Sequence, residues 1–318
     1  MATGLIVSGQ STSAIRSAGA VDFAKAAKSE NTQRSYRSTW SMFVNEFCTD
    51  LGYKPLPATP DVVVEFITWS SDRSVSTVET RLAAVSFAHR LAGFPDPTDN
   101  EEVRLVLKGM RRKKGRPPVR KEPLAGNDLE KVITALPYNT MSGIRDRAII
   151  LVGFAGAFRR SEIAELHLGD VRFKSDEMVI TLARSKTDQE GLGAVKHIPI
   201  VGGPLCPVAA LKMWLHESGI IEGPLFRRVD RWEKVGKYAL DDGSIARIVK
   251  KAVQAVGLDP RKFSGHSLRA GFVTAAADAD VPEYAIREQT GHRSNVLQAY
   301  VRDQGRGAKR AVKAALLG

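Results

Sequence analysis

Cysteine is nearly absent from the sequence. Cys48 and Cys206 are the only two among 318 residues, and they are too far apart for a metal-ligand motif. A scaffold held together by several disulfides is therefore excluded, which fits a protein of a reducing compartment. We expect both thiols to be buried as small apolar side chains.

Long hydrophobic runs are missing as well. The longest apolar run, residues 148–158, is about half of the ~20 residues that a membrane-spanning helix needs. The N-terminus has no basic segment followed by a long apolar core, and residues 1–20 have the composition of a flexible lead. We therefore expect a cytoplasmic protein with no membrane partner.

Motifs for nucleotide and metal chemistry are also lacking. The sequence contains no Gly-rich phosphate loop, and no His or carboxylate cluster has metal-ligand spacing. A reaction driven by a nucleotide or a metal would lack its parts, so we expect neither a cofactor nor a metal. Internal repeats and low-complexity tracts are absent too.

Positive charge is what the sequence has in excess. The 47 Lys and Arg residues outnumber 35 Asp and Glu residues, which gives a net charge of +12 and a pI of about 9.8. This excess favours a polyanionic partner, nucleic acid ahead of an anionic membrane surface. The 43% hydrophobic content is that of a globular protein, and the length suits about two domains.

Residues 21–110 have the pattern of a small helical domain without strands. A first helix is predicted by aromatic side chains that recur on one face, namely Tyr36, Trp40, Phe43 and Phe47. Further helices are predicted over 60–69, from Val78 to an end at Gly93, and over 100–110.

A basic segment, 111–123, follows this domain. Seven of the residues 111–121 are basic, and their Gly-x-Pro-Pro sequence opposes regular structure. A solvated linker and a nuclear-targeting tract are alternatives, but a strap along DNA phosphates explains the charges at least as well. The candidate contacts are Arg111, Arg112, Lys113, Lys114 and Arg116.

Residues 124–318 combine helices with a few strands. Strands are predicted at 178–183 and 195–201 around a polar turn, with 171–173 as a third. Helices are predicted at 144–155, 208–217, 244–256, 266–277 and 282–289. A last helix, 308–317, is too short to be stable alone in water and must dock on another surface.

Groups able to do chemistry are spread over this second half in a fixed order. Arg159 stands where an apolar helix meets the next one, and Glu162 is one turn later. The others are Lys186 at the predicted hairpin tip, His266 and Arg269 one turn apart, His292 after a glycine, and Tyr300. Taken singly, each has a structural alternative as a helix-end cation, a solvated tip or a core ring.

This ordered set resembles the tyrosine recombinases over nearly the whole chain. Residues 159–300 are similar to the catalytic domain, and the first half is similar to the core-binding domain of Cre-like members, above all at 89–97. The resemblance implies a mainly α protein of two domains. These are a four-helix SAM-like DNA-binding domain and an α+β catalytic domain with a small antiparallel sheet.

The resemblance also implies a role for each group. Tyr300 would be the nucleophile of a covalent 3′-phosphotyrosine intermediate, and Arg159 with Arg269 would bind the phosphate. Lys186 matches the general acid for the leaving 5′-oxygen. His266 and His292 match residues that contact the phosphate or handle the tyrosine proton, and Glu162 would orient its neighbours.

Two positions depart from the family pattern. The step from His292 to Tyr300 is eight residues, whereas the family more often has nine, so we expect a shorter loop. Cre-like members have Trp where this chain has His292, so the resemblance there is to the wider family.

The resemblance further implies contacts to DNA and to other subunits. Ser76, Thr80 and Arg81 in the first domain and Ser244, Arg247 and Lys251 in the second are candidate DNA contacts. The partner would be a double-stranded site with inverted half-sites. The helix 308–317 would dock on a neighbour in a cyclic tetramer, with docking on its own domain as the alternative.

Three functions are therefore compared. The leading one is site-specific recombination without ATP or metal, by a simple recombinase with few accessory proteins, because little chain precedes Ser29. A type IB topoisomerase or telomere resolvase would use the same constellation. A non-catalytic DNA-binding regulator would not need it.

Overall fold

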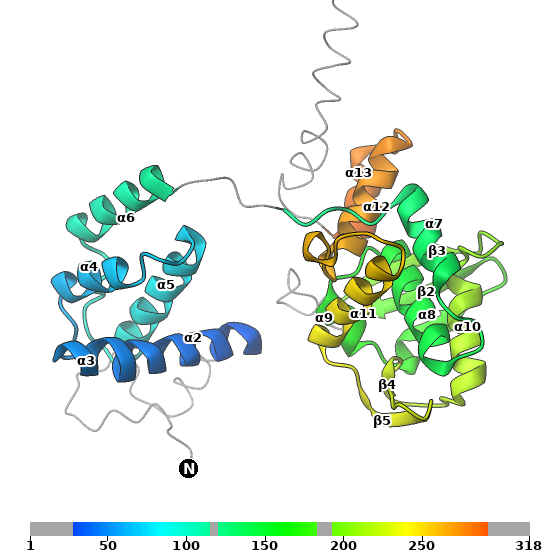
Figure 1. Cartoon of the computed structure of the whole chain (residues 1–318), viewed down its shortest axis with the longest axis horizontal. Helices are drawn as coiled ribbons and strands as arrows, with labels where there is room; N and C mark the ends of the chain where they lie inside the picture. The colour runs from blue at the N-terminus through cyan, green and yellow to red at the C-terminus, as the bar shows by residue number, and fades with distance from the viewer. Residues whose placement is uncertain (1–27, 115–119, 183–192, 292–318) are drawn as a thin grey trace, which may run out of the picture. The chain divides into compact units, whose positions relative to one another are not determined.

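A computed structural model describes residues 28–114, 120–182 and 193–291. The chain divides into two compact units, Met1–Pro118 and Val119–Gly318, which are considered one at a time (Figure 1). In the described ranges, no helix has both the length and the apolar character that crossing a membrane requires.

All regular secondary structure in the described part of the first unit is helical. Its elements are α2 (Glu30–Met42), a π-helical stretch (Phe43–Cys48), α3 (Thr49–Leu51), α4 (Pro60–Trp69), α5 (Val75–Leu91) and α6 (Glu101–Lys114). The hydroxyls of Ser29 and Ser74 accept backbone N–H groups at the starts of α2 and α5, and Pro60 begins α4. The predicted helices of this half are therefore confirmed.

Aromatic side chains form the core of the first unit. Phe43, Phe47 and Phe66 are fully buried, and the rings of Phe43 and Phe66 meet edge to face at 4.9 Å between centroids. Cys48 is buried among them, and Cys206 is buried in the second unit, as predicted for both thiols.

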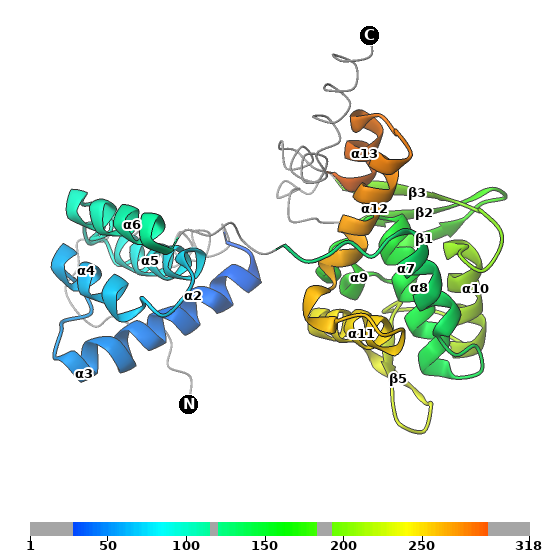
Figure 2. The same cartoon turned by 45° about the horizontal axis from the view of Figure 1, so that its top comes forward.

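The described part of the second unit combines helices with two small antiparallel sheets. Its helices are α7 (Gly126–Ala135), α8 (Met141–Ala155), α9 (Arg160–Glu165), α10 (Pro207–Ser218), α11 (Asp242–Ala255), α12 (His266–Asp278) and α13 (Glu283–Thr290), with 3₁₀ turns at Leu168–Asp170 and Pro260–Lys262. The larger sheet has the order β1 (Val171–Phe173), β2 (Glu177–Leu182), β3 (Ala194–Pro199). Helix α8 is largely buried at the centre, and α12 and α13 lie together at one end (Figures 1 and 2).

An extended segment leads into the second unit across α12. The backbone N–H of Glu122 donates to Lys262 O at 2.8 Å, and that of Leu124 donates to Ser267 O at 3.0 Å. Gly271 makes this crossing possible, because a Cβ there would lie 2.0 Å from Leu124 O. The start of the unit is thus fastened to the helix that carries His266 and Arg269.

One expectation about secondary structure was wrong, and one hairpin was not anticipated. The basic segment was expected to lack regular structure from residue 111, but α6 continues through Lys114, because Lys and Arg favour helices and complement the negative end of the helix dipole. The hairpin of β4 (Arg227–Val229) and β5 (Val235–Ala239) was missed, since its register is irregular and its strands are short.

Candidate catalytic site

The first arginine of the predicted set lies at the turn between α8 and α9. Ala157 in this turn has a left-handed φ of 48°, a conformation that is uncommon outside glycine and stores strain. Arg159 follows, and its Nη1 donates to Glu162 Oε1 at 2.5 Å while its backbone N–H donates to Glu162 Oε2 at 2.8 Å. Because Glu162 is only 5% exposed, one buried carboxylate fixes both the backbone and the head group of Arg159.

The second arginine lies one turn into α12 and is 2% exposed. Arg269 Nη1 donates to Ala157 O at 2.7 Å, and Nη2 donates to Thr290 O at 2.5 Å. These carbonyls belong to the α8–α9 turn and to the end of α13, which are far apart in the sequence. The planar guanidinium suits this position because it presents several donors in fixed directions.

His266 begins α12, one turn before Arg269. Part of the residue reaches solvent, yet the pKa of its imidazole is lowered, first by desolvation and then by the positive charges of Arg269 and Arg159. The neutral imidazole is therefore favoured at neutral pH, and this form can accept a proton or a hydrogen bond.

Arg159, Glu162, His266 and Arg269 form a charged cluster. Lys196 belongs to it as well, although the sequence reasoning did not single it out. It faces inward from β3 on the same side as Ile198 and is 3% exposed. Its Nζ donates to Gln289 O at 2.5 Å. Its pKa is lowered to about 8, first by desolvation and then by the positive charges of Arg269 and Arg159, while Glu162 opposes the shift. The available signal was the alternation of β3, which puts a lysine at an inward position where an apolar residue is usual.

The end of α13 is fastened from several sides. Gln289 Nε2 donates to Ala155 O at 2.7 Å and to His197 O at 3.3 Å, which joins α13 to α8 and β3. Gly291 then closes the helix in a left-handed conformation with φ 66°. The chain next enters the segment that carries His292 and Tyr300.

The cluster carries more positive than negative charge. Arg159, Arg269 and Lys196 are cations, and Glu162 is the carboxylate that acts on Lys196 together with the two arginines. Such an arrangement suits an anion with several oxygens, as a phosphodiester has. Within the described residues, no group of His, Cys, Asp or Glu could hold a metal ion.

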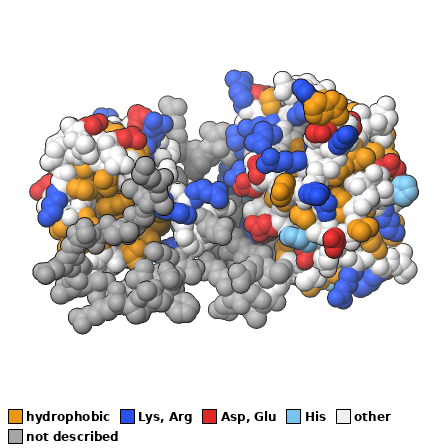
Figure 3. Space-filling model, turned by 90° about the horizontal axis from the view of Figure 1, so that it is seen from below, with side chains coloured by type: hydrophobic (Ala, Val, Ile, Leu, Met, Phe, Trp, Pro, Cys, Tyr) orange, Lys and Arg blue, Asp and Glu red, His pale blue; other side chains and the backbone are white. Residues whose placement is uncertain are grey.

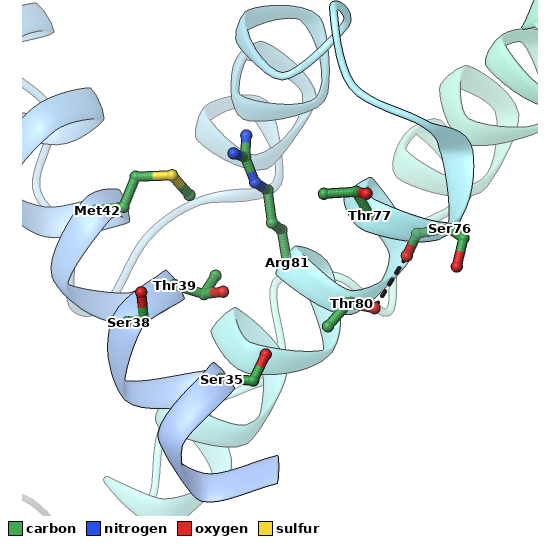
Figure 4. Close-up of a pocket in the computed structure, with 8 residues that line it drawn as sticks. All are labelled: Ser35, Ser38, Thr39, Met42, Ser76, Thr77, Thr80 and Arg81. Atoms are coloured by element: carbon green, nitrogen blue, oxygen red, sulfur yellow. Dashed lines mark hydrogen bonds between the residues drawn. The ribbon is translucent and has the colours of Figure 1, made fainter. Parts of the chain in front are cut away.

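A second polar site occupies the first unit, between α2 and α5. Figure 4 shows Arg81 pointing into a pocket that is bordered by hydroxyl groups. Its lining residues are Ser35, Ser38, Thr39 and Met42 from α2 and Ser76, Thr77, Thr80 and Arg81 from α5. Arg81 Nη1 donates to Ser70 Oγ at 2.7 Å, and its guanidinium lies 5.7 Å from the Trp69 ring centroid. The predicted trio thus shares one pocket, and α2 adds hydroxyls that were not anticipated.

Comparison with known proteins identifies the family of this chain. Residues 122–305 match the phage integrase family. An integrase/recombinase XerD homologue of Selenomonas ruminantium is 38% identical over 283 residues, which cover 87% of this chain and 83% of that one. The chain belongs to the phage integrase family. It is a tyrosine recombinase, an enzyme that breaks and rejoins DNA.

Other relatives of this recombinase agree in sequence or in fold. The Cre recombinase of Escherichia phage P1 is 25% identical over 292 residues, covering 83% of this chain and 84% of Cre. The XerH recombinase bound to a palindromic difH substrate superposes with a TM-score of 0.65 at 17% identity, over 88% of this chain and 78% of that chain. A lambda integrase dimer bound to a core site superposes with a TM-score of 0.61 at 16% identity, over 90% of this chain and 94% of that chain. These two superpositions show a shared fold.

The structure brings part of the predicted catalytic set together. Arg159 and Glu162 are in direct contact, and Arg159, Arg269 and His266 are close enough for the two arginines to lower the histidine pKa. Lys186, His292 and Tyr300 lie outside the described residues, as does Arg116.

Three of the other candidate DNA contacts of this recombinase, Arg111, Ser244 and Arg247, have partners within the protein. Arg111 Nη2 pairs with Glu79 Oε1 at 2.7 Å on the first unit. At the start of α11, Ser244 Oγ donates to Asp241 Oδ2 at 2.6 Å and accepts from Arg247 Nη2 at 2.7 Å, which makes these residues part of a helix cap. Lys251 is exposed on the same helix. Figure 3 shows Lys and Arg side chains gathered along one margin of the second unit.

Proposed function

We propose that this recombinase exchanges DNA strands at a specific site through a covalent bond between Tyr300 and a 3′-phosphate, without ATP or metal. The observation that carries the proposal is the assembly of Arg159, Arg269 and His266 into one cluster, from elements that are over a hundred residues apart. The XerD homologue and Cre, to which the chain is similar, are both named recombinases.

We assign Arg159 and Arg269 to binding the phosphate that Tyr300 attacks. As Tyr300 attacks, negative charge builds on the non-bridging oxygens, and two fixed guanidinium groups stabilise it. Glu162 holds Arg159 for this task, while the carbonyls of Ala157 and Thr290 hold Arg269. Orientation before the reaction starts is what makes such groups effective.

Proton transfer is assigned to the remaining residues. The Tyr300 oxygen forms a bond to phosphorus as the bond to the 5′-oxygen breaks, and Lys186 gives that oxygen its proton. His266 or His292 accepts the phenol proton, a role for which the neutral form of His266 is suited. Attack by a 5′-hydroxyl of another strand reverses these steps, so the energy of the broken bond is conserved.

DNA binding is assigned to both units. We assign the four-helix first unit to the SAM-like core-binding domain, its pocket of hydroxyls with Arg81 facing DNA, and residues 111–123 to a basic strap. The second unit is the catalytic domain, with Ser244, Arg247 and Lys251 as backbone contacts.

Assembly is assigned to the C-terminal helix. A lambda integrase tetramer bound to a Holliday junction shares the fold with a TM-score of 0.60. On that precedent, four copies of this recombinase act on a site with inverted half-sites, and the helix 308–317 of each copy docks on its neighbour.

A covalent trapping experiment tests the proposal. Nicked suicide duplexes from a genomic library are incubated with the protein, and adducts that resist denaturant are isolated and their DNA sequenced. Wild type should yield adducts on one sequence family, and Tyr300→Phe should yield none. Adducts on unrelated sequences, with relaxation of any supercoiled plasmid, would indicate a type IB topoisomerase instead. Sequence-specific binding with no adduct would indicate a regulator.

A further inference from the structure

Lys196 occupies a place where a lysine is costly. It points inward from β3 beside Ile198 and is 3% exposed, so its ammonium has lost most of its hydration. A residue of this kind persists when a strong partner is available, and its partners are therefore informative.

Its hydrogen-bond partner is the C-terminal turn of α13. The last carbonyls of a helix have no acceptor role within the helix and carry partial negative charge. Lys196 Nζ donates to Gln289 O at 2.5 Å, and Arg269 Nη2 donates to the next carbonyl, Thr290 O, at 2.5 Å. Two buried cations from two elements thus hold two successive carbonyls.

The same turn is the last described part of the chain before the segment that carries Tyr300. Gly291 ends α13, and a Cβ on it would lie 4.0 Å from Lys196 Nζ, so the lysine head sits directly beside the exit of the chain. His292 is the next residue and Tyr300 follows eight residues later. The position of this turn therefore fixes where that segment starts relative to Arg159 and Arg269.

We propose that Lys196 is a positioning residue of the recombinase, which holds the C-terminal turn of α13 so that the segment beginning at His292 enters the catalytic cluster in register. The proposal rests on the function proposed above. It assigns Lys196 no proton transfer to DNA, which remains with Lys186.

Lys196→Met tests this role, because Met keeps the length of the side chain and removes its charge. The substitution removes the cost of a buried charge but also the hydrogen bond to Gln289 O, and because these effects oppose each other the melting temperature should change little. The rate of covalent adduct formation should fall by about tenfold or more, since a charge-assisted hydrogen bond is lost, while affinity for the trapped duplex changes less. Lys196→Arg should recover part of the rate. Lys131→Met, an exposed lysine on α7, is the matched control and should behave as wild type.

Two further measurements make the outcome decisive. Hydrogen exchange on the full-length protein should be faster at 286–291 in Lys196→Met than in Lys131→Met, a result that needs no DNA.

A substrate with sulfur in place of the leaving 5′-oxygen needs no proton donor. It should therefore restore the cleavage rate of Lys186→Ala and leave Lys196→Met slow. Rescue of Lys196→Met by this substrate would identify Lys196 as the proton donor. Unchanged hydrogen exchange at 286–291, or an unchanged rate of adduct formation, would show that Lys196 has no positioning role. Absence of adducts from wild type would instead overturn the proposed function.

Discussion

The side chain of Arg269 has both a structural and an electrostatic role. Its guanidinium bridges Ala157 O and Thr290 O, and so joins the α8–α9 turn to the end of α13. The same positive charge lowers the pKa of His266 and of Lys196. A substitution at this residue should therefore change both the shape and the potential of the cluster.

Arg269→Lys is expected to lower the rate of adduct formation by about 10²–10³-fold, the usual cost of losing a donor to the charged transition state. An ammonium keeps the charge but cannot span two carbonyls with fixed geometry. Single-turnover cleavage of a suicide duplex measures the rate, and Arg261→Lys, at an exposed arginine just before α12, is the control. Equal rates for the two variants would show that geometry at Arg269 is unimportant.

Residues 89–97 have a structural role within the first unit. His89 is fully buried, accepts the N–H of Ala58 through Nε2 at 2.9 Å, and places Nδ1 2.8 Å from Val85 O. Asp96 accepts bonds from Ser86, Thr98 and Arg90, which hold its pKa at about 2. His89 thus joins α5 to the segment that precedes α4, and Asp96 fixes the connection from α5 to α6.

The stability of the protein should fall with acid because of His89. Burial lowers its pKa below 6.5, outweighing the carbonyl of Val85 and the charge of Asp96, so the unfolded chain binds the proton more readily. The contribution of neutral His89 is complete above about pH 6.5 and is lost as pH falls through the lower, folded pKa. Urea unfolding of wild type and His89→Gln at pH 8 and pH 5 should differ less at pH 5. His216→Gln, at an exposed histidine, should show no such convergence.

Helix α12 is the element on which the second unit is organised. It carries His266 and Arg269 on its first turns, packs against α8 and α13, and is crossed by the segment around Leu124. The crossing requires a residue without a side chain at Gly271. Displacing the segment would disturb α12 close to the site.

Gly271→Ala should destabilise the protein by about 1–3 kcal/mol or more, as overpacking does, because its Cβ would meet backbone atoms that have little freedom to move. Gly109→Ala in α6 is the matched control, since its Cβ would meet no atom within 4 Å and alanine is favoured in helices by about 1 kcal/mol. Chemical denaturation measures both. A Gly271→Ala protein as stable as wild type would show that the segment adjusts at no cost.

The whole molecule is basic, and its net charge of +12 favours association with DNA. The segment between the two units concentrates this charge, and its first residues continue α6. If that segment contacts DNA phosphates, it should affect the salt dependence of DNA binding more than the preference for one DNA sequence.

Replacing Arg112, Lys113, Lys114 and Arg116 by Gln should reduce the slope of log affinity against log salt by up to about 4, since each phosphate contact contributes about 0.9. Binding of the trapped duplex and of a random duplex should weaken alike. Lys131→Gln with Lys174→Gln, two exposed lysines of the second unit, is the control. An unchanged slope would remove the segment from the DNA contacts.

The sequence by itself determined what depends on neighbours along the chain. Helical periodicity, strand alternation and capping residues act over a few positions, so α2, α5, α10 and the β2–β3 pair could be predicted, and so could the contact of Arg159 with Glu162 one turn apart. The order of the reactive residues was enough to identify the family.

Tertiary structure decided everything that depends on packing between distant segments. Arg269 reaches carbonyls of Ala157 and Thr290, and Lys196 reaches Gln289 O over 93 positions of the chain. No local pattern encodes such pairings, because they arise when buried elements meet and each buried polar group must find a partner. For the same reason Lys196 was read only as part of a strand, and its place in the cluster emerged from the fold.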